Sequence, residues 1–289
     1  MKLCDIRDFE DPAIRRLAHE LVPGRDDETV VERKLWEYAM LALFLEDVGR
    51  LTEETEVLGV AAGNEEALYW LANRVGRVVA TDIYGEGAFV GREAAVSMLD
   101  DPTAHAPYPY REDRLDVRYM DGRSLEFPDE SFDVVYSLSS IEHFGSPHDV
   151  ARASAEIGRV LRPGGHAFIV TECFVKLHPL NRAPVDFAGR LATLGRRRAV
   201  ATPRRRAVVG EVFKPRELQS RIVRPSGMRL MQPLDTSLSG ESWDNLCLLV
   251  PPPPEVRLEP ASGEYFPHVL LQASRSVFTS VCLALEKEA

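Results

Sequence analysis

The sequence contains no apolar run long enough to cross a membrane. Its longest such run, YAMLALFL from Tyr38, is far below the roughly 18 residues that suggest a membrane span. The first residues, MKLCDIRDFEDP, carry acids where a signal peptide needs cations, and they lack an apolar core. We therefore expect a cytoplasmic protein with no membrane span.

Cysteine is also scarce. The four cysteines lie far apart, form no C-x-x-C pair and have no histidine nearby at ligand spacing: Cys4, Cys173, Cys247 and Cys282. This pattern disfavours a zinc site and a disulfide framework. We predict reduced thiols in the core and no bound metal.

The chain lacks an excess of positive charge. It has 35 Lys and Arg against 45 Asp and Glu, a formal net charge of −10, which argues against a general nucleic-acid binder. Residues 176–214 depart from this trend, with ten Lys or Arg and only two acids. We expect a basic insertion or lid there, which either attracts an anionic acceptor or is a solvated loop. RNA is disfavoured because no aromatic residue lies between Phe187 and Phe213 for base stacking.

Helical spacing dominates the start of the chain. Residues 12–52 place apolar side chains at intervals of three and four, with Val31, Leu35, Tyr38 and Ala42 on one face. This predicts an N-terminal helical cap over residues 1–52. Trp36 and Tyr38 either close a cofactor pocket or belong to the core.

From Thr55 onward, short apolar strands alternate with amphipathic helices. The strands are EVLGV, RVVATD, LDVRYMD, FDVVYSLS and GGHAFIVTE. This alternation predicts an α/β protein with a Rossmann-like, doubly wound, mostly parallel sheet and helices on both faces. SVFTSVCLALEKE near the end is expected to add an antiparallel strand. We divide the chain into the cap, a core over 53–175, the basic segment 176–214, and a part over 215–289 that completes the sheet.

The turn GVAAGNE after the first strand lies where doubly wound sheets bind their ligands. It offers G-x-x-x-G, with Gly59 and Gly63, instead of the G-x-G-x-x-G of a dinucleotide site. Asn64 is the expected N-cap, and Glu65 and Glu66 begin the helix, so a phosphate would meet two carboxylates there. The turn therefore suits a cofactor whose nearby end is cationic.

Acidic residues also follow the next two strands. Asp82 lies 19 residues after Gly63, where a carboxylate can accept hydrogen bonds from the hydroxyls of a ribose. The alternative is an ordinary N-cap or loop acid. Asp121 in the Met120–Gly122 stretch either accepts a hydrogen bond from an adenine amino group or simply marks a turn.

Four segments in this order resemble class I S-adenosylmethionine-dependent methyltransferases, and most closely the ubiquinone/menaquinone-biosynthesis type. They are VLGVAAGNE, VVATDIYG, MDGRSLEFPDESFDVVYSLSSIEHF and ASAEIGRVLRPGGHAFIVTE. The resemblance implies a seven-stranded sheet and bound S-adenosyl-L-methionine. It places Gly63 and its neighbours near the methionine part, Asp82 on the ribose, Ile83 against the adenine, and Asp121, next to Gly122, at the adenine amino group.

The sequence departs from this family at the first turn. Gly59 stands where the family usually has an acid, and Ala61 and Glu65 stand where it has glycines. We hypothesise that Glu65 supplies the negative charge that faces the methionine ammonium. The alternative is a solvated first-turn glutamate that only favours the helix.

Methyl transfer needs mainly positioning, and a hydroxyl acceptor also needs a base. His143 in SSIEHF is the first candidate, because its pKa is ordinarily near neutral; otherwise it shapes the loop. Glu172 and His178 are further candidates for contacting an acceptor. Ser137, Ser139 and Ser140 are candidate donors to the cofactor carboxylate or the acceptor.

The function predicted from the sequence is methyl transfer from S-adenosylmethionine to oxygen or nitrogen of a small-molecule or glycan-like acceptor, with S-adenosylhomocysteine as product. Two alternatives are a nicotinamide-dependent oxidoreductase and a non-catalytic binding protein derived from this fold. The identity of the acceptor and the oligomeric state stay open.

Overall fold

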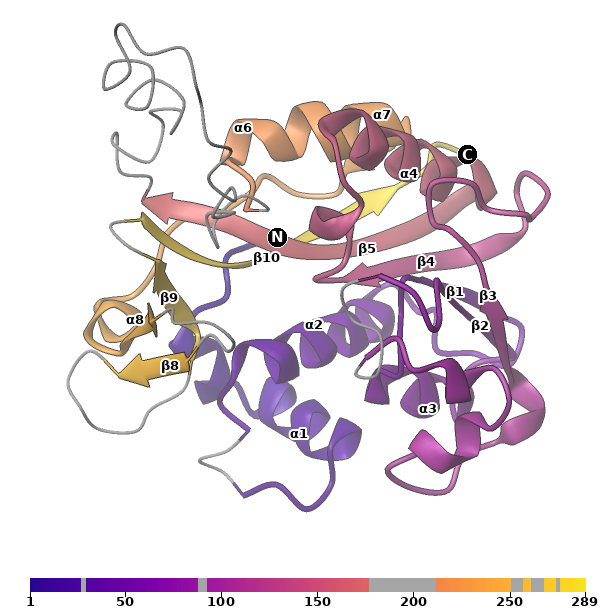
Figure 1. Cartoon of the computed structure of the whole chain (residues 1–289), viewed down its shortest axis with the longest axis horizontal. Coiled ribbons are helices and arrows are strands. Elements are labelled where there is room, and N and C mark those ends of the chain that lie inside the picture. The colour runs from indigo at the N-terminus through magenta and orange to yellow at the C-terminus, as the bar shows by residue number, and fades with distance from the viewer. Residues whose placement is uncertain (27–29, 88–92, 177–211, 251–256, 261–267, 274–275) are drawn as a thin grey trace, which may run out of the picture.

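The protein is built on one large sheet with helices on both of its faces (Figure 1). The computed structural model describes residues 1–26, 30–87, 93–176, 212–250, 257–260, 268–273 and 276–289. Most of the segment expected to be a basic insertion or lid, and His178 with it, lies outside the described residues.

Ten strands form the sheet in the order β3-β2-β1-β4-β5-β10-β9-β7-β8, with β6 paired to β10. Their bounds are β1 (Glu56–Val60), β2 (Arg77–Asp82), β3 (Leu115–Tyr119), β4 (Phe132–Leu138), β5 (Leu161–Lys176), β6 (Arg229–Leu230), β7 (Leu246–Val250), β8 (Arg257–Pro260), β9 (Leu270–Ala273) and β10 (Ser276–Glu286). The first five strands are mutually parallel, and β10 runs antiparallel to β5. The predicted doubly wound sheet and its final antiparallel strand are confirmed.

The predicted number of seven strands is wrong, because the described residues contain ten. The additional strands are two to five residues long, too short to display a period in the sequence. One of them, β8, lies within the proline-rich stretch PPPPEVRLEP. Pairing with neighbouring strands, which is a tertiary interaction, decides their conformation.

Side chains alternate between two cores, one on each face of the sheet. Val57 and Val78 point toward the helices α1 (Pro12–Leu21), α2 (Arg33–Asp47) and α3 (Glu66–Ala72). Leu58 and Val79 point toward the other face, which is covered by α4 (Pro147–Val160), α6 (Pro215–Leu218) and α7 (Arg224–Ser226). A π-helical segment, Gln219–Val223, lies between α6 and α7, and α8 (Gly240–Asp244) precedes β7. Short 3-10 helices cover Ile6–Glu10, Val96–Met98, Pro102–His105, Glu112–Arg114 and Ile141–His143.

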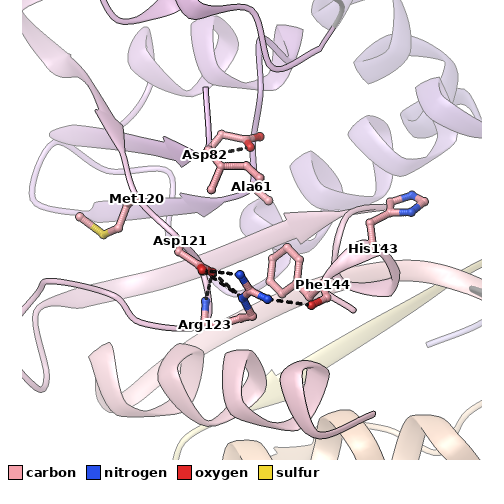
Figure 2. A pocket seen from close by; sticks show the side chains of 9 residues that line it. Ala61, Asp82, Met120, Asp121, Arg123, His143 and Phe144 are labelled. Carbon is pink, nitrogen blue, oxygen red and sulfur yellow. Dashed lines mark hydrogen bonds and ion pairs between the residues drawn. The ribbon is translucent and has the colours of Figure 1, made fainter. Parts of the chain in front are cut away.

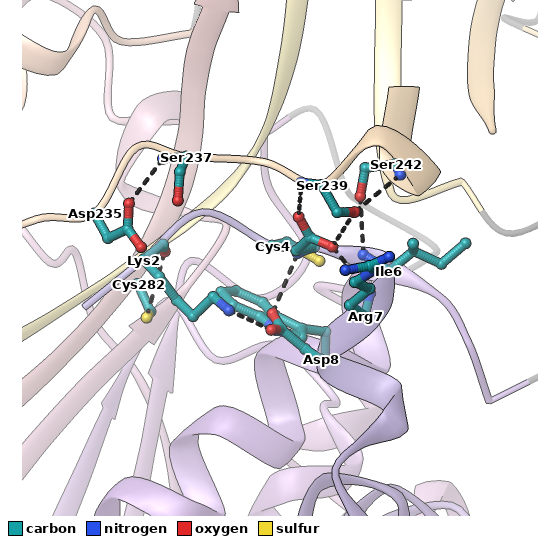
Figure 3. Close-up of polar contacts among 12 residues, drawn as sticks. Lys2, Cys4, Ile6, Arg7, Asp8, Asp235, Ser237, Ser239, Ser242 and Cys282 are labelled. Atoms are coloured by element: carbon teal, nitrogen blue, oxygen red, sulfur yellow. Dashed lines mark hydrogen bonds and ion pairs between the residues drawn. The ribbon is translucent and has the colours of Figure 1, made fainter. Parts of the chain in front are cut away.

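The N-terminal helices are fastened to the rest of the protein by buried carboxylates (Figure 3). Asp5 accepts hydrogen bonds from the backbone N and Oγ of Ser239, at 2.5 and 2.7 Å. Asp8 accepts one at 2.7 Å from Nε1 of Trp36, which is fully buried in α2. Trp36 is therefore a core residue, and the same holds for Tyr38, which is 4% exposed. This leaves other residues at the start of α2 to face the site.

The four cysteines are all buried core thiols, as predicted. Cys4 and Cys282 pack in the core beneath α1 and α2, and Cys173 packs in the opposite one. Among the helices that the structure describes, none has the length and apolar content needed to span a membrane.

Candidate functional site

A pocket of about 110 Å³ lies at the carboxyl ends of the parallel strands (Figure 2). The strand order reverses between β1 and β4, and doubly wound sheets bind ligands at this position. Six of the predicted site residues line the pocket: Ala61, Asp82, Ile83, Asp121, Gly122 and His143. Sequence reasoning missed three other lining residues as site residues: Met120, Arg123 and Phe144.

The turn after β1 requires glycine at position 63. Gly63 has a φ of +49°, and a Cβ atom there would lie 2.6 Å from the backbone oxygen of Glu93. Its amide donates a 2.9 Å hydrogen bond to Oδ2 of Asp82. Ala61 adopts a similar left-handed conformation, with a φ of +52°, at a position where the family usually has glycine. The chain thus keeps the backbone shape of the turn despite its altered sequence.

Asp82, at the end of β2, is oriented by two backbone amides. Besides Gly63, the amide of Ile83 donates to its Oδ1 at 2.7 Å. Burial raises the pKa of Asp82, and these two amides oppose that shift. Each carboxylate oxygen can accept more than one hydrogen bond, so acceptor capacity remains for two hydroxyls. This geometry suits a ribose diol.

Asp121, at the start of the loop that follows β3, is bound by Arg123 (Figure 2). The guanidinium donates to both carboxylate oxygens at 2.6 to 3.0 Å, and the Arg123 amide donates to Oδ1 at 2.9 Å. These bonds hold the pKa of Asp121 below its usual value. The carboxylate is therefore fixed as an ionised acceptor at one wall of the pocket. The Asp-x-Arg spacing across a turn was the available signal for Arg123.

No acidic side chain fits at Gly59, because Tyr136 fills the space beside it. A Cβ atom on Gly59 would lie 2.8 Å from the Tyr136 hydroxyl and 2.8 Å from the Cβ of Ala62. Tyr136 is fully buried on β4, and its hydroxyl has no hydrogen-bond partner among the described residues. The loss of the family's acid at this position is therefore linked to an aromatic residue on the neighbouring strand.

Glu65 lies beside the turn, buried, and is the N-cap of α3 in place of the expected Asn64. Its Oε1 accepts a 2.6 Å hydrogen bond from Nζ of Lys34 on α2. Burial raises the pKa of Glu65 to about 7, although Lys34 opposes this shift. Glu65 is not a solvated first-turn glutamate.

The other predicted residues do not line the pocket. Ser137 is fully buried on β4, and its Oγ has no hydrogen-bond partner among the described residues. Glu172, on β5, forms an ion pair with Arg33 of α2. Their predicted roles stay predictions.

His143 follows β4 at the end of a 3-10 helix, and Figure 2 shows it at the opposite end of the pocket from Met120. Its neighbour Glu142 is buried and accepts a 2.8 Å hydrogen bond from Oγ1 of Thr171. Burial, assisted by the charge of Glu172, raises the pKa of Glu142 to about 8. This shift favours the protonated form of Glu142.

Residues 58–169, which include every residue lining the pocket, match a family described as a methyltransferase domain. The chain is 34% identical over 109 residues to a 27-O-demethylrifamycin SV methyltransferase of Amycolatopsis mediterranei (strain S699), covering 38% of this chain and 35% of the relative. It is 35% identical over 152 residues to a Mycolicibacterium smegmatis protein described as a probable S-adenosylmethionine-dependent methyltransferase, covering 47% and 56%. The chain thus spans about a third to a half of the length of these relatives.

A solved structure shares the fold. The geranyl diphosphate C-methyltransferase of Streptomyces coelicolor A3(2), determined with Mg²⁺, geranyl-S-thiolodiphosphate and S-adenosyl-L-homocysteine, aligns with a TM-score of 0.50. The alignment covers 99% of this chain and 86% of that one, at 14% sequence identity. At this identity, the likeness concerns the fold alone.

Placing an acidic side chain at position 59 should destabilise the folded protein. We expect Gly59→Asp to lower the free energy of unfolding by about 3 kcal/mol, because the new side chain collides with Tyr136 and buries a charge. Urea denaturation measures this loss, with Gly240→Asp as control because Gly240 is exposed and has open space around it. Adding Tyr136→Leu to Gly59→Asp should recover part of the loss; a neutral Gly59→Asp variant contradicts the packing.

Stability should fall as the pH rises from about 5 to 8. The pKa of Glu142 is raised to about 8 in the folded protein, so the folded state binds more protons than the unfolded state across this window. Glu142→Gln should therefore flatten the dependence of unfolding free energy on pH. Urea denaturation at pH 5, 6.5 and 8 measures it, with the exposed Glu126→Gln as control. An unchanged slope in Glu142→Gln argues against a buried, protonated Glu142.

Proposed function

Since residues 58–169 form a class I S-adenosylmethionine-dependent methyltransferase domain, we propose that this protein transfers a methyl group to a small-molecule or glycan-like acceptor. The cofactor of such a domain is S-adenosyl-L-methionine. When bound, it supplies a methyl group on a positively charged sulfur, and S-adenosylhomocysteine is the product. The observation that carries this proposal is the pocket at the carboxyl ends of β1 to β4, whose lining comes wholly from the matched domain.

The residues of the pocket fit the nucleoside part of the cofactor. Asp82 retains acceptor capacity for the two ribose hydroxyls, and Asp121 is held ionised as an acceptor for the adenine amino group. Ile83 and Phe144 supply apolar surface for the base. Gly122 packs closely in this wall, because a Cβ atom there would lie 2.8 Å from Cγ1 of Val60 and 3.0 Å from the ring of Phe144.

Glu65 fits the cationic end of the cofactor. Its Oε2 is buried and has no hydrogen-bond partner among the described residues, so it leaves an acceptor for the methionine ammonium. Ala61 contributes backbone to the same turn, where a small residue permits close approach; the predicted role of Gly59 in cofactor binding stays a prediction, because Tyr136 fills the space beside it. A pyrophosphate would be repelled here, which weakens the nicotinamide alternative.

The chain's own part in methyl transfer is to position the acceptor and to take up a proton. In-line displacement requires the acceptor atom to face the methyl group with water excluded. His143 is the candidate base for a hydroxyl acceptor, since it lines the pocket and follows β4. An oxygen acceptor agrees with the name of the Amycolatopsis relative, which refers to 27-O-demethylrifamycin SV. Glu172 is the second candidate for contacting the acceptor. The cytoplasmic location expected from the sequence also stays a prediction.

Transfer of labelled methyl tests the proposed function. We expect S-adenosylmethionine with a labelled methyl group, incubated with the protein and fractions of cell extract, to yield a labelled small molecule that mass spectrometry identifies. His143→Gln should keep the affinity for S-adenosylhomocysteine, measured by calorimetry, and lower the transfer rate at least about a hundredfold if His143 is the base. Absence of binding of either form of the cofactor contradicts the proposal. Binding without transfer to any fraction favours the non-catalytic alternative.

Glu65→Gln should weaken cofactor binding severalfold without unfolding the protein. The substitution keeps the shape of the side chain and removes the charge that the methionine ammonium would contact. Calorimetry with S-adenosylhomocysteine measures the change, and Glu66→Gln, one residue further on, is the matched control. Equal affinities of wild type and Glu65→Gln exclude the assigned role.

A further inference from the structure

Lys34 is half-buried, and its ammonium lies at the centre of a cluster of acceptors that no sequence pattern predicted. The Lys34 cluster consists of the Lys34 ammonium, the carboxylates of Glu37 and Glu65, and the backbone oxygen of Leu138. The ammonium lies 2.6 Å from Oε1 of Glu65, 3.2 Å from the Leu138 oxygen and 3.4 Å from Oε2 of Glu37. The elements α2, α3 and β4 therefore meet at this one cation, beside the turn after β1.

The cluster contains more acceptors than its cation satisfies. Oε1 of Glu37 accepts hydrogen bonds from the hydroxyls of Ser139 and Ser280, at 2.7 and 2.6 Å. Oε2 of Glu37 has no hydrogen bond but forms the ion pair with Lys34, whereas Oε2 of Glu65 has no hydrogen-bond partner among the described residues, although Glu65 is only 7% exposed. Leaving a buried carboxylate oxygen without a donor is costly, so the cluster suits a further cationic donor at Glu65.

We infer that Lys34 is a positioning residue for the amino-acid end of the cofactor: its ammonium pairs with Oε1 of Glu65 and favours the ionised carboxylate, so that the free oxygen of Glu65 binds the methionine ammonium. This inference rests on the proposed function and adds to it a residue of α2 that does not line the nucleoside pocket. It also gives the helical cap a role in cofactor binding.

The charges around Glu65 explain why this role falls to Lys34. The other ionisable groups that act on Glu65, or on which it acts, are acids or phenols: Glu37 and Tyr38 from α2, Glu66 from α3, Tyr84 after β2, and Tyr136 from β4. Among these described neighbours, Lys34 is the cation that opposes protonation of Glu65. Without it, burial and the nearby carboxylates would leave Glu65 neutral at physiological pH and a weak partner for an ammonium.

The decisive experiment compares two ligands in Lys34→Met. S-adenosylhomocysteine carries the amino-acid group, and 5′-methylthioadenosine carries the nucleoside without it. We expect Lys34→Met to weaken S-adenosylhomocysteine binding about tenfold and to leave 5′-methylthioadenosine binding unchanged, because only the former needs an ionised Glu65. Affinity of the variant for S-adenosylhomocysteine should rise severalfold between pH 7 and 8 as Glu65 loses its proton, whereas the wild-type affinity rises no more than about twofold, because its Glu65 has a pKa of about 7. Lys34→Arg should restore most of the affinity.

The control is Lys287→Met. Lys287 likewise combines an ion pair, with Glu130, and a hydrogen bond to a backbone oxygen, that of Leu161, but it does not belong to the site. Unchanged or tighter binding of S-adenosylhomocysteine by Lys34→Met overturns the inference.

A second measurement separates this inference from the proposed function. Failure of the wild type to bind either ligand would refute the proposed function. The carboxyl of Glu65 can still be titrated by NMR in the ligand-free protein. The inferred role requires a higher pKa for Glu65 in Lys34→Met than in the wild type, and equal pKa values overturn it.

Discussion

The hydrogen bond from the Gly63 amide to Asp82 holds the site together. It joins the turn after β1 to the end of β2, two parallel strands that finish at the same edge of the sheet. It forms because Gly63 adopts a φ of +49° in a space that a Cβ atom cannot enter. The same bond orients the Asp82 carboxylate, which lines the pocket. It thereby links the pocket to the turn that leads into α3 and to Glu65 of the Lys34 cluster.

The helical cap contributes charge as well as coverage of the sheet. Two consecutive cations at the start of α2, Arg33 and Lys34, pair with Glu172 and Glu65 on different elements. These ion pairs are only partly buried, and partly exposed pairs add little net stability. The proposed role of the Lys34 pair in cofactor binding gives a reason for its place beside the turn, where one oxygen of Glu65 has no hydrogen-bond partner among the described residues. The cap thus combines an apolar core of Trp36 and its neighbours with a polar end that faces the site.

Several features could be predicted from particular residues. The alternation of apolar strands with helices predicts the parallel sheet, and the acids that follow successive strands, Asp82 and Asp121, lie in one pocket because parallel strands end at a common edge. The short strands after β5 could not be predicted, because pairing with β10 and with one another determines them. Arg123 and Phe144 were not predicted as site residues, because it is the conformations of their loops that bring them to the pocket wall. Tyr136 explains the glycine at position 59 only once the two strands are seen side by side.

The sequence by itself determined the class of fold and the edge of the sheet at which the pocket lies, and it predicted a preference of the first turn for a cationic group. These follow from local periodicity, from strand order and from the charges at a helix start, all of which are properties of short stretches of chain. Only the tertiary structure decided that Glu65 is buried, that Lys34 is its partner and that Tyr136 occupies the place of the missing acid. Those pairings join residues far apart in the chain, and it is packing of α2, α3 and β4 against one another that brings them into contact.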